Sequence, residues 1–434
     1  MSFFSGLWTT FLEYCQSEEI VDKIMKRDYY FLLYMSGLYS NLKERFRLLS
    51  VVLFFVNTGI AFFHMYVMVN TLFIISKLNF TLSTFMFQIF MLMQFSVFML
   101  FAFTVKRQTF RQLCREIGTP FAYEGEDHET ALKNIAKEVL GEKRKLMILP
   151  IFLCLVGANC MLFGPFIDTM YGDPGFNQTE KGFFTGIPIS GVYPWHIPEE
   201  SKTLHFYVLG SLQLLSALFL LSVIGSGTIV FMNVAYFYVE SAKYLLHNID
   251  TVESRAEMEF RKSYFGRKNV EDLYSDRRFL KCLENCLKKN FCHHQKLIRL
   301  FHLFQDVLSW PIGYAYFTGT IVIALSLLSI KTGTSLPGTA ATSLMMCILE
   351  VCIMAMLSFL GQRMIDLNED LRFSIYSLKW FMVQNGVKLD LMILQEMTLR
   401  PVELKGFGLV TCNLDTFANV MNSAYSYYNL IMAV

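Results

Sequence analysis

Charged residues are scarce in this chain of 434 residues, where they make up 17% of the sequence against 54% hydrophobic residues. In an ordinary soluble domain about a quarter of the residues are charged and about half are apolar. The shortage of charge excludes such a domain and predicts a bilayer as the solvent. The net charge of +2 provides no general attraction to nucleic acid, so any electrostatic signal depends on where the charges lie.

The motifs of common enzymes are also missing. The sequence contains no glycine-rich phosphate loop, no nucleophile elbow and no HExxH metal motif. We therefore predict no enzymatic activity, no cofactor and no resident metal ion.

Two further absences concern targeting and disulfide bonds. The first 47 residues carry Glu13, Glu18, Glu19 and Asp22 and lack the basic start, apolar core and cleavage site of a signal peptide. The first membrane helix is then expected to direct insertion itself. None of the ten cysteines falls in a segment that we place outside the cell, so no extracellular disulfide is predicted.

Long apolar stretches, in contrast, are abundant. Crossing a bilayer as a helix takes about 20 mostly apolar residues, and five stretches without Asp, Glu, Lys or Arg qualify: residues 48–76, 78–105, 146–167, 204–239 and 307–330. Two more, residues 332–362 and 406–434, contain one acid each, Glu350 and Asp415. The predicted fold class is an all-α integral membrane protein with seven transmembrane helices.

Basic residues are divided very unevenly between the two sides of these spans. The N-terminal region (1–47), the loops 106–145 and 240–306, and the segment 363–405 hold 34 of the 38 Lys and Arg residues. Because cytosolic loops collect basic residues, we predict a cytosolic N-terminus and an extracellular C-terminus. Both glycosylation sequons, at Asn79 and Asn177, fall on the predicted outer side.

The loop 240–306 shows apolar residues at three- and four-residue spacing, which indicates helices. We expect them to extend the spans into a cytosolic bundle, joined by an anchor helix within residues 363–405. The alternative is a calmodulin target or a lipid-facing helix. A cluster in this loop matches no strong zinc motif, so reduced thiols and surface histidines are expected there. It comprises Cys282, Cys286, Cys292, His293 and His294.

The last span, within residues 406–434, carries a stripe of polar and small residues on one helix face. The stripe comprises Asn419, Asn422, Ser423, Ser426, Leu430 and Ala433. Such a face avoids lipid, and two interpretations remain open. One is close packing against a neighbouring helix. The other is a water-filled pore lined by copies of this helix, with Leu430 as a hydrophobic constriction.

The C-terminal part of the chain resembles the insect odorant receptors in an ordered series of features. These are Tyr376 and Trp380, the pair Arg400 and Pro401, then Leu404, Gly406 and Phe407, the run NLDTF at 413–417 and the run SAYSYY at 423–428. The match in length, topology and loop sizes covers the whole chain. The resemblance implies a seven-helix, ligand-gated, non-selective cation channel with the inverted orientation derived above.

Within that family, a ligand-binding tuning subunit assembles with a shared co-receptor into a heterotetramer whose pore is lined by the last helix. The chain resembles a tuning subunit, because the loop 240–306 lacks the co-receptor's insertion and residues 429–434 depart from the co-receptor's tail. The resemblance places the gate at Leu430 and the protein in the plasma membrane of a sensory neuron dendrite. The alternatives are a gustatory-type channel, a G-protein-coupled receptor and a secondary transporter.

The resemblance also places a ligand pocket in the outer half of spans 2–6, within residues 48–362. Aromatic, sulfur-bearing and small residues there suit a small, volatile and mostly apolar ligand. The candidate ligand-binding residues are Met86, Phe87, Phe90, Gly157, Met161, Tyr207, Ser211, Leu214, Tyr316, Phe317, Thr320, Thr342 and Met345.

Two acids within the spans are candidates for coupling. An ionised carboxylate at mid-span is costly, so Glu350 is expected to face a partner or a wet cavity. A buried, hydrogen-bonded structural acid is the alternative. Asp415 belongs to the family pattern and is expected at the ion exit or at a subunit contact.

Overall fold

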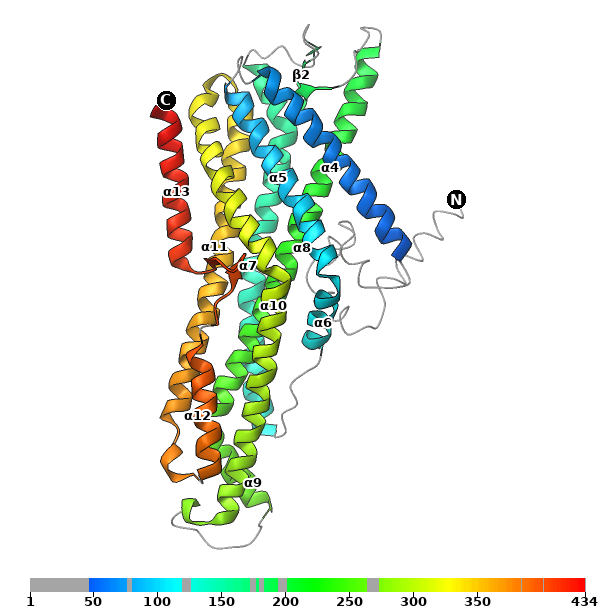
Figure 1. Cartoon of the computed structure of the whole chain (residues 1–434). Coiled ribbons are helices and arrows are strands. Elements are labelled where there is room, and N and C mark those ends of the chain that lie inside the picture. The colour runs from blue at the N-terminus through cyan, green and yellow to red at the C-terminus, as the bar shows by residue number, and fades with distance from the viewer. Residues whose placement is uncertain are drawn as a thin grey trace.

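We describe the chain in a computed structural model, over residues 47–75, 80–118, 126–171, 177–178, 183–193, 201–263, 273–383, 385–400 and 402–433. Long helices dominate this part of the chain (Figure 1). The α-helices are α4 (Arg47–Ile75), α5 (Phe80–Val105), α6 (Arg107–Gly118), α7 (Glu126–Met170), α8 (Lys202–Asp250), α9 (Val252–Ser263), α10 (Arg277–Thr332), α11 (Pro337–Ser377), α12 (Asn385–Leu399) and α13 (Leu414–Ala433).

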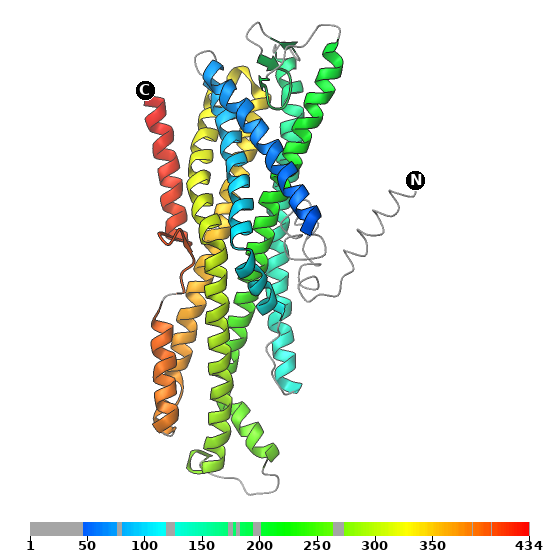
Figure 2. The same ribbon diagram turned by 45° about the vertical axis from the view of Figure 1, so that its right-hand side comes forward.

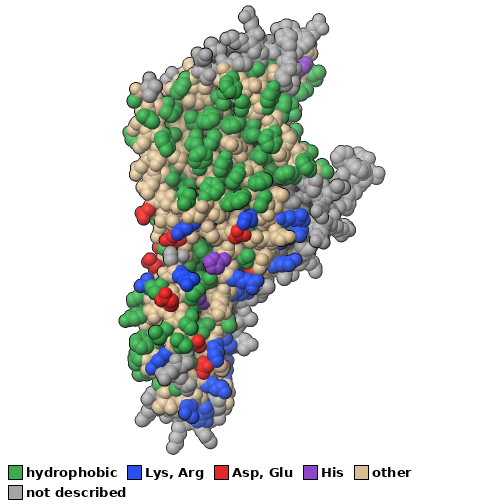
Figure 3. Space-filling view, in the orientation of Figure 1, with side chains coloured by type: hydrophobic (Ala, Val, Ile, Leu, Met, Phe, Trp, Pro, Cys, Tyr) green, Lys and Arg blue, Asp and Glu red, His purple; other side chains and the backbone are tan. Residues whose placement is uncertain are grey.

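Six of the described helices, α4, α5, α7, α8, α10 and α11, are long and apolar enough to cross a membrane. Each covers all or most of one of the first six predicted spans, so the all-α membrane class is confirmed. The two faces of the bundle differ along its length. In Figure 3 apolar side chains fill the upper part of the visible face, whereas Lys, Arg, Asp and Glu gather below it.

The seventh predicted span differs from the structure at its start. Residues 406–413 do not continue the helix, because strands β4 (Lys405–Gly406) and β5 (Val410–Thr411) pair as an antiparallel hairpin. Helix α13 begins only at Leu414 and has 20 residues. With its polar stripe, α13 is not among the helices given above as apolar enough to cross a membrane.

Four membrane helices continue far beyond the apolar zone. Helix α7 begins at Glu126, α8 extends to Asp250, α10 begins at Arg277 with α9 packed against it, and α11 runs on to Ser377. The prediction that loop 240–306 extends the spans as helices is therefore confirmed. The segment 363–405 contains two helical pieces rather than one helix: the end of α11 and, after a 3-10 turn at Trp380–Met382, helix α12.

A small antiparallel sheet covers the opposite end of the bundle, which we call the sheet end. It consists of β1 (Asn177–Gln178), β2 (Phe183–Thr185) and β3 (Gly191–Val192), in that order. The side chain of Gln213 on α8 fixes the loop before β3, donating from Nε2 to the Ile189 carbonyl (2.8 Å) and accepting from the Ile189 N–H (3.1 Å). Of the two sequons, Asn177 starts β1 and Asn79 lies outside the described residues.

Helix α13 stands at the edge of the bundle in both ribbon views, with the C-terminus at its upper tip (Figures 1 and 2). It contacts α10 and α11. The N-terminal region 1–46 lies outside the described residues.

Candidate functional site

Helices α7 and α11 run antiparallel side by side and organise the site. At the sheet end, the carboxylate of Asp168 on α7 accepts hydrogen bonds from the backbone N–H of Gly338 (2.6 Å), and from the N–H (3.1 Å) and the hydroxyl (2.8 Å) of Thr339. These groups belong to the first turn of α11, whose N–H groups have no partner within the helix. Asp168 therefore caps α11 from the neighbouring helix.

Just below this cap the two backbones touch. A Cβ atom on Gly338 would overlap the carbonyl group of Gly164, and the Thr342 hydroxyl donates to the carbonyl of Cys160 (3.1 Å). Close approach of this kind between membrane helices depends on small residues. The sheet-end halves of α7 and α11 thus form one tightly packed pair.

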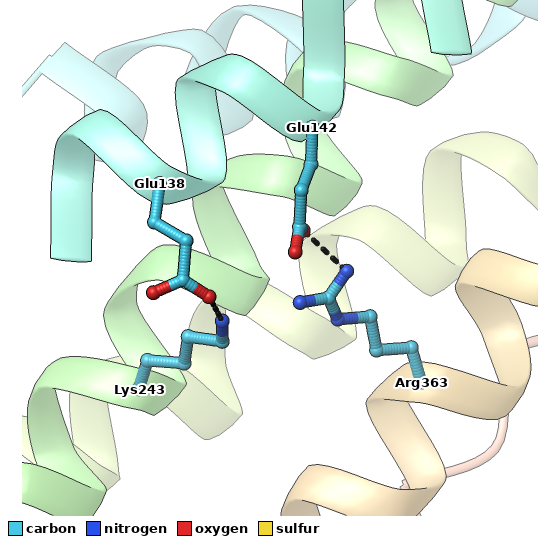
Figure 4. Close-up of polar contacts among 4 residues, drawn as sticks. All are labelled: Glu138, Glu142, Lys243 and Arg363. Atoms are coloured by element: carbon cyan, nitrogen blue, oxygen red, sulfur yellow. Dashed lines mark hydrogen bonds and ion pairs between the residues drawn. The ribbon is translucent and has the colours of Figure 1, made fainter. Parts of the chain in front are cut away.

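Charged side chains join the same helices at the lower edge of the apolar zone (Figure 4). Arg363 on α11 donates to Glu142 on α7 at 2.5 Å, and Lys243 on α8 donates to Glu138 on α7 at 2.8 Å. The first pair is the better shielded, with 20% and 35% of the two side chains exposed. Helices α7, α8 and α11 are therefore linked electrostatically where they leave the apolar zone.

The structure divides the predicted ligand residues into three groups by burial. Met86, Met161, Tyr316 and Thr342 are buried. Phe90, Gly157, Thr320 and Met345 are half-buried. Phe87, Tyr207, Ser211, Leu214 and Phe317 are exposed. Phe87 and Phe317 in the exposed group each follow a buried candidate in the sequence, Met86 and Tyr316. Phe87 stacks on the half-buried Phe90, with ring centroids 6.1 Å apart.

Two of the buried candidates, Thr342 and Tyr316, use their hydroxyl groups in contacts with neighbouring segments of the chain. Thr342 donates to Cys160 as described, and also approaches the carbonyl of Gly338 (2.9 Å). The Tyr316 hydroxyl lies 2.5 Å from the hydroxyl oxygen of Ser358 and 3.3 Å from the sulfur of Cys412. Tyr316 therefore faces the β4–β5 hairpin and not the sheet-end half where the ligand was predicted.

Glu350 lies against a glycine of α10. A Cβ atom on Gly319 would be 2.7 Å from Oε1 of Glu350 and 2.6 Å from the sulfur of Met354. The absence of a side chain at Gly319 thus gives the acid room at the contact between α10 and α11. Sequence reasoning singled out Glu350 but did not find Gly319.

Sequence reasoning also missed Gln88 on α5 and Ser343 on α11, which are both fully buried. Polar residues within the apolar runs 78–105 and 332–362 were the available signal. The candidate ligand residues were chosen mainly as aromatic and sulfur-bearing side chains. A buried amide or hydroxyl, however, requires a hydrogen-bond partner more strictly than an aromatic ring does.

The β4–β5 hairpin is clamped between α10 and α11 and leads directly into α13. Gln305 on α10 donates to the Lys405 carbonyl (2.6 Å) and accepts from the Lys405 N–H (2.8 Å). On the other side, a Cβ atom on Gly361 of α11 would overlap the carbonyl of Cys412. The hairpin turn also places Phe407 at a φ of 53°, a left-handed conformation that is uncommon for a bulky residue.

The polar stripe predicted on the last span faces away from the bundle. All six of its residues are exposed in the single chain. Of the described residues of α13, Ala424 alone is buried. Leu430 is 64% exposed. Asp415, in the first turn, is exposed as well. Helix α13 thus presents its polar face to whatever surrounds this chain.

The Cys and His cluster of α10 lies inside the lower helical bundle. Cys286 donates to Glu259 (3.4 Å), while His293 and His294 are each only 3% exposed, so the expectation of surface histidines was wrong. Packing against α8 buries that face of α10, and burial lowers the pKa of His293 to about 3 and that of His294 to about 4. Within the described residues, no group of three or more His, Cys, Asp or Glu is arranged to hold a metal ion.

Comparison with known proteins identifies the fold and the sequence class. The profile of the 7tm Odorant receptor family matches residues 79–425. Odorant receptor 49a of Drosophila melanogaster is 31% identical over 71 residues, which cover 16% of this chain and 18% of that protein.

Two solved structures of the olfactory receptor OR5 from Machilis hrabei resemble most of the chain in fold. One has a TM-score of 0.66 and 14% identity, and the match covers 90% of this chain and 89% of that one. The other, a complex with eugenol, has a TM-score of 0.69 and 12% identity, covering 96% and 100%.

Proposed function

The chain belongs to the 7tm odorant receptor family, a family of receptors and not of enzymes, and we propose that it is the ligand-binding tuning subunit of an odorant-gated cation channel. In this proposal it assembles with a co-receptor into a heterotetramer in the plasma membrane of a sensory neuron dendrite. Cations pass through a pore lined by the last helix of each subunit.

The observation that carries the proposal is the uncovered polar face of α13. A face with Asn419, Asn422 and Ser426 is poorly suited to lipid, and the chain itself leaves it exposed. Copies of this helix around a common axis would enclose water, and Leu430, near the C-terminal tip, would then narrow the pore as an apolar ring.

We place the N-terminus in the cytosol and the C-terminus outside, with α13 as the seventh span. The charge distribution supports this orientation, because the Lys and Arg residues gather at the end of the bundle away from the sheet. The sheet end is then extracellular, and Asn79 and Asn177 lie on the side where glycosylation takes place.

The ligand in this proposal is a small, volatile and mostly apolar molecule bound in the sheet-end half of the bundle. The Machilis hrabei receptor, which shares the fold, has been solved with eugenol bound. In this chain, Met86, Met161 and the half-buried Phe90 and Met345 supply apolar surface in that half.

Helix α11 connects this region to the pore helix. The first turns of α11 contact α7 and α5, and Glu350 in its middle lies against α10. Further along, Gly361 contacts the β4–β5 hairpin that precedes α13. A ligand that binds the open arrangement more tightly than the closed one shifts α11, and with it the hairpin and Leu430.

The test is whole-cell current from cells that express this chain with and without an insect co-receptor, exposed to a panel of volatiles. We expect a ligand-evoked cation current that requires the co-receptor and changes its rectification or basal level with Leu430→Ala. Leu409→Ala, at an exposed hairpin position, is the matched control and should behave as the wild type. Absence of any current from a surface-expressed pair would refute the proposal.

A further inference from the structure

One face of α5 presents three polar side chains to the neighbouring helices, and two of them are satisfied. Thr81 donates to the Thr332 carbonyl (3.1 Å) and Thr84 lies 2.8 Å from the hydroxyl oxygen of Ser329 on α10. Gln88, one turn further along α5, is the third. The helix therefore places a bulky amide where its two predecessors bind α10.

Gln88 is fully buried, and only one of the two polar atoms of its amide has a hydrogen-bond partner. Its Nε2 approaches the sulfur of Met346 on α11 at 3.2 Å, which is a weak acceptor, while Oε1 is buried without a hydrogen-bond partner. A buried carbonyl oxygen without a donor destabilises the protein, so such atoms are rare.

A second unpartnered group lies beside it. Ser343 precedes Met346 by three residues, so the two side chains are neighbours on the same face of α11. Ser343 is fully buried and its hydroxyl has no partner either. Gln88 on α5 and Ser343 on α11 each lie about 10 Å along the helix from its sheet-end start, at a rise of about 1.5 Å per residue.

Gln88 Oε1 and the Ser343 hydroxyl are two buried polar atoms of complementary type, both unsatisfied and both near Met346, so together they suit one kind of ligand. We infer that Gln88 and Ser343 form the hydrogen-bonding end of the ligand pocket and recognise a small apolar volatile that carries one hydroxyl group, an alcohol or a phenol. The ligand hydroxyl donates to Oε1 of Gln88 and accepts from the hydroxyl of Ser343. This inference rests on the proposed function and names its ligand class.

The test compares volatile alcohols and phenols with their methyl ethers, which keep the oxygen but cannot donate. In cells with this chain and an insect co-receptor, we expect the free hydroxyl compound to need a roughly tenfold lower concentration for half-maximal current. Gln88→Met removes the acceptor that only the hydroxyl compound can use, so it should reduce that difference severalfold. Ser343→Ala removes the donor to the oxygen that both compounds keep, so both compounds should need a severalfold higher concentration.

The matched control is Ser96→Ala, also fully buried on α5, because its hydroxyl already donates to the Leu92 carbonyl at 3.0 Å. It should leave the preference for the hydroxyl compound intact. Surface labelling confirms that the variants reach the membrane. We expect Gln88→Met and Ser343→Ala to do so, since replacing an unsatisfied polar group by an apolar one is nearly neutral.

Equal potency of alcohol and ether, an unchanged preference in Gln88→Met, or unchanged potency of both compounds in Ser343→Ala, with the variants at the cell surface, would overturn the inference while leaving the proposed function in place. Failure of every volatile to evoke current would overturn the proposed function and the inference together.

Discussion

The guanidinium of Arg363 donates a 2.5 Å hydrogen bond to the carboxylate of Glu142, and so ties α11 to α7 at the lower edge of the apolar zone. The same two helices are tied at the sheet end by Asp168, which caps the first turn of α11. The α7 and α11 pair is therefore held at two points, and the predicted ligand region lies between them.

Removing one partner of the Glu142 and Arg363 pair should destabilise the protein. Both side chains are largely shielded from water, so Arg363→Gln leaves a carboxylate with poor solvation. We expect a coupling free energy of about 1 kcal/mol between Glu142→Gln and Arg363→Gln in a double-mutant cycle. Thermal unfolding of detergent-solubilised protein measures it.

The control for this pair is an exposed ion pair within α7. Glu129 and Lys133 on α7 are 62% and 71% exposed, so Glu129→Gln should leave the unfolding temperature unchanged. Strictly additive effects of the two substitutions in the Glu142 and Arg363 cycle would show that the contact contributes nothing.

Replacing Gly361 by alanine should disturb the β4–β5 hairpin, which precedes α13. The added Cβ overlaps the carbonyl of Cys412, so α11 and the hairpin must separate. We expect Gly361→Ala to cost about 1–3 kcal/mol of stability and to weaken ligand-evoked current. Gly141→Ala on α7 is the control, because a Cβ there meets no atom within 4 Å, and it should be neutral or slightly stabilising. Wild-type currents from Gly361→Ala would argue against coupling through this contact.

Asp168→Ala should loosen the start of α11. The substitution leaves the N–H groups of Gly338 and Thr339 without their acceptor, at a cost of about 1–2 kcal/mol. Asp168→Asn keeps one acceptor oxygen and should fall between the wild type and the alanine variant. The unfolding temperature reports this order, and an alanine variant that unfolds with the wild type would contradict it.

Acid should destabilise the lower bundle through His294. In the unfolded chain an imidazole has a pKa near 6.5, whereas burial lowers the pKa of His294 to about 4. Between these two pH values the unfolded chain binds a proton that the folded chain does not. Stability is therefore complete above about pH 6.5 and falls as the pH drops toward 4, by on the order of 2 kcal/mol at pH 5.

The measurement is the unfolding temperature between pH 7.5 and pH 5 for the wild type and His294→Gln. The variant cannot titrate, so its stability should fall less with pH, with His293 contributing the remaining loss. His302→Gln, at an exposed position on the same helix, should follow the wild type. Parallel curves for wild type and His294→Gln would exclude His294 as the source.

The membrane spans were predictable because they depend on local properties. Length, hydropathy and the sidedness of Lys and Arg are all read from consecutive residues, and α4, α5, α7, α8, α10 and α11 cover all or most of the expected stretches. The start of α13 was not predictable in this way. Residues 406–413 are apolar enough for a helix, but Gln305 and Gly361, distant in sequence, hold them as a hairpin.

The ligand region shows the same limit. Tyr316 and Phe317 are adjacent aromatic residues, yet one is 3% exposed and the other 55%, because packing between helices decides which of them faces inward. Gln88 was overlooked for the opposite reason. Its importance depends on a hydrogen bond that its surroundings fail to supply, and this is a property of the folded neighbourhood alone.

Helix α11 makes its contacts at different places along its length. Ser343 and Met346 lie near its start, Glu350 follows, Gly361 meets the hairpin, and Arg363 meets α7. Substitutions in the first turns can therefore change chemical preference without disturbing the contact that leads to the pore. A receptor built on such a helix can acquire new ligands during evolution by single mutations, while selection independently maintains the machinery that opens it.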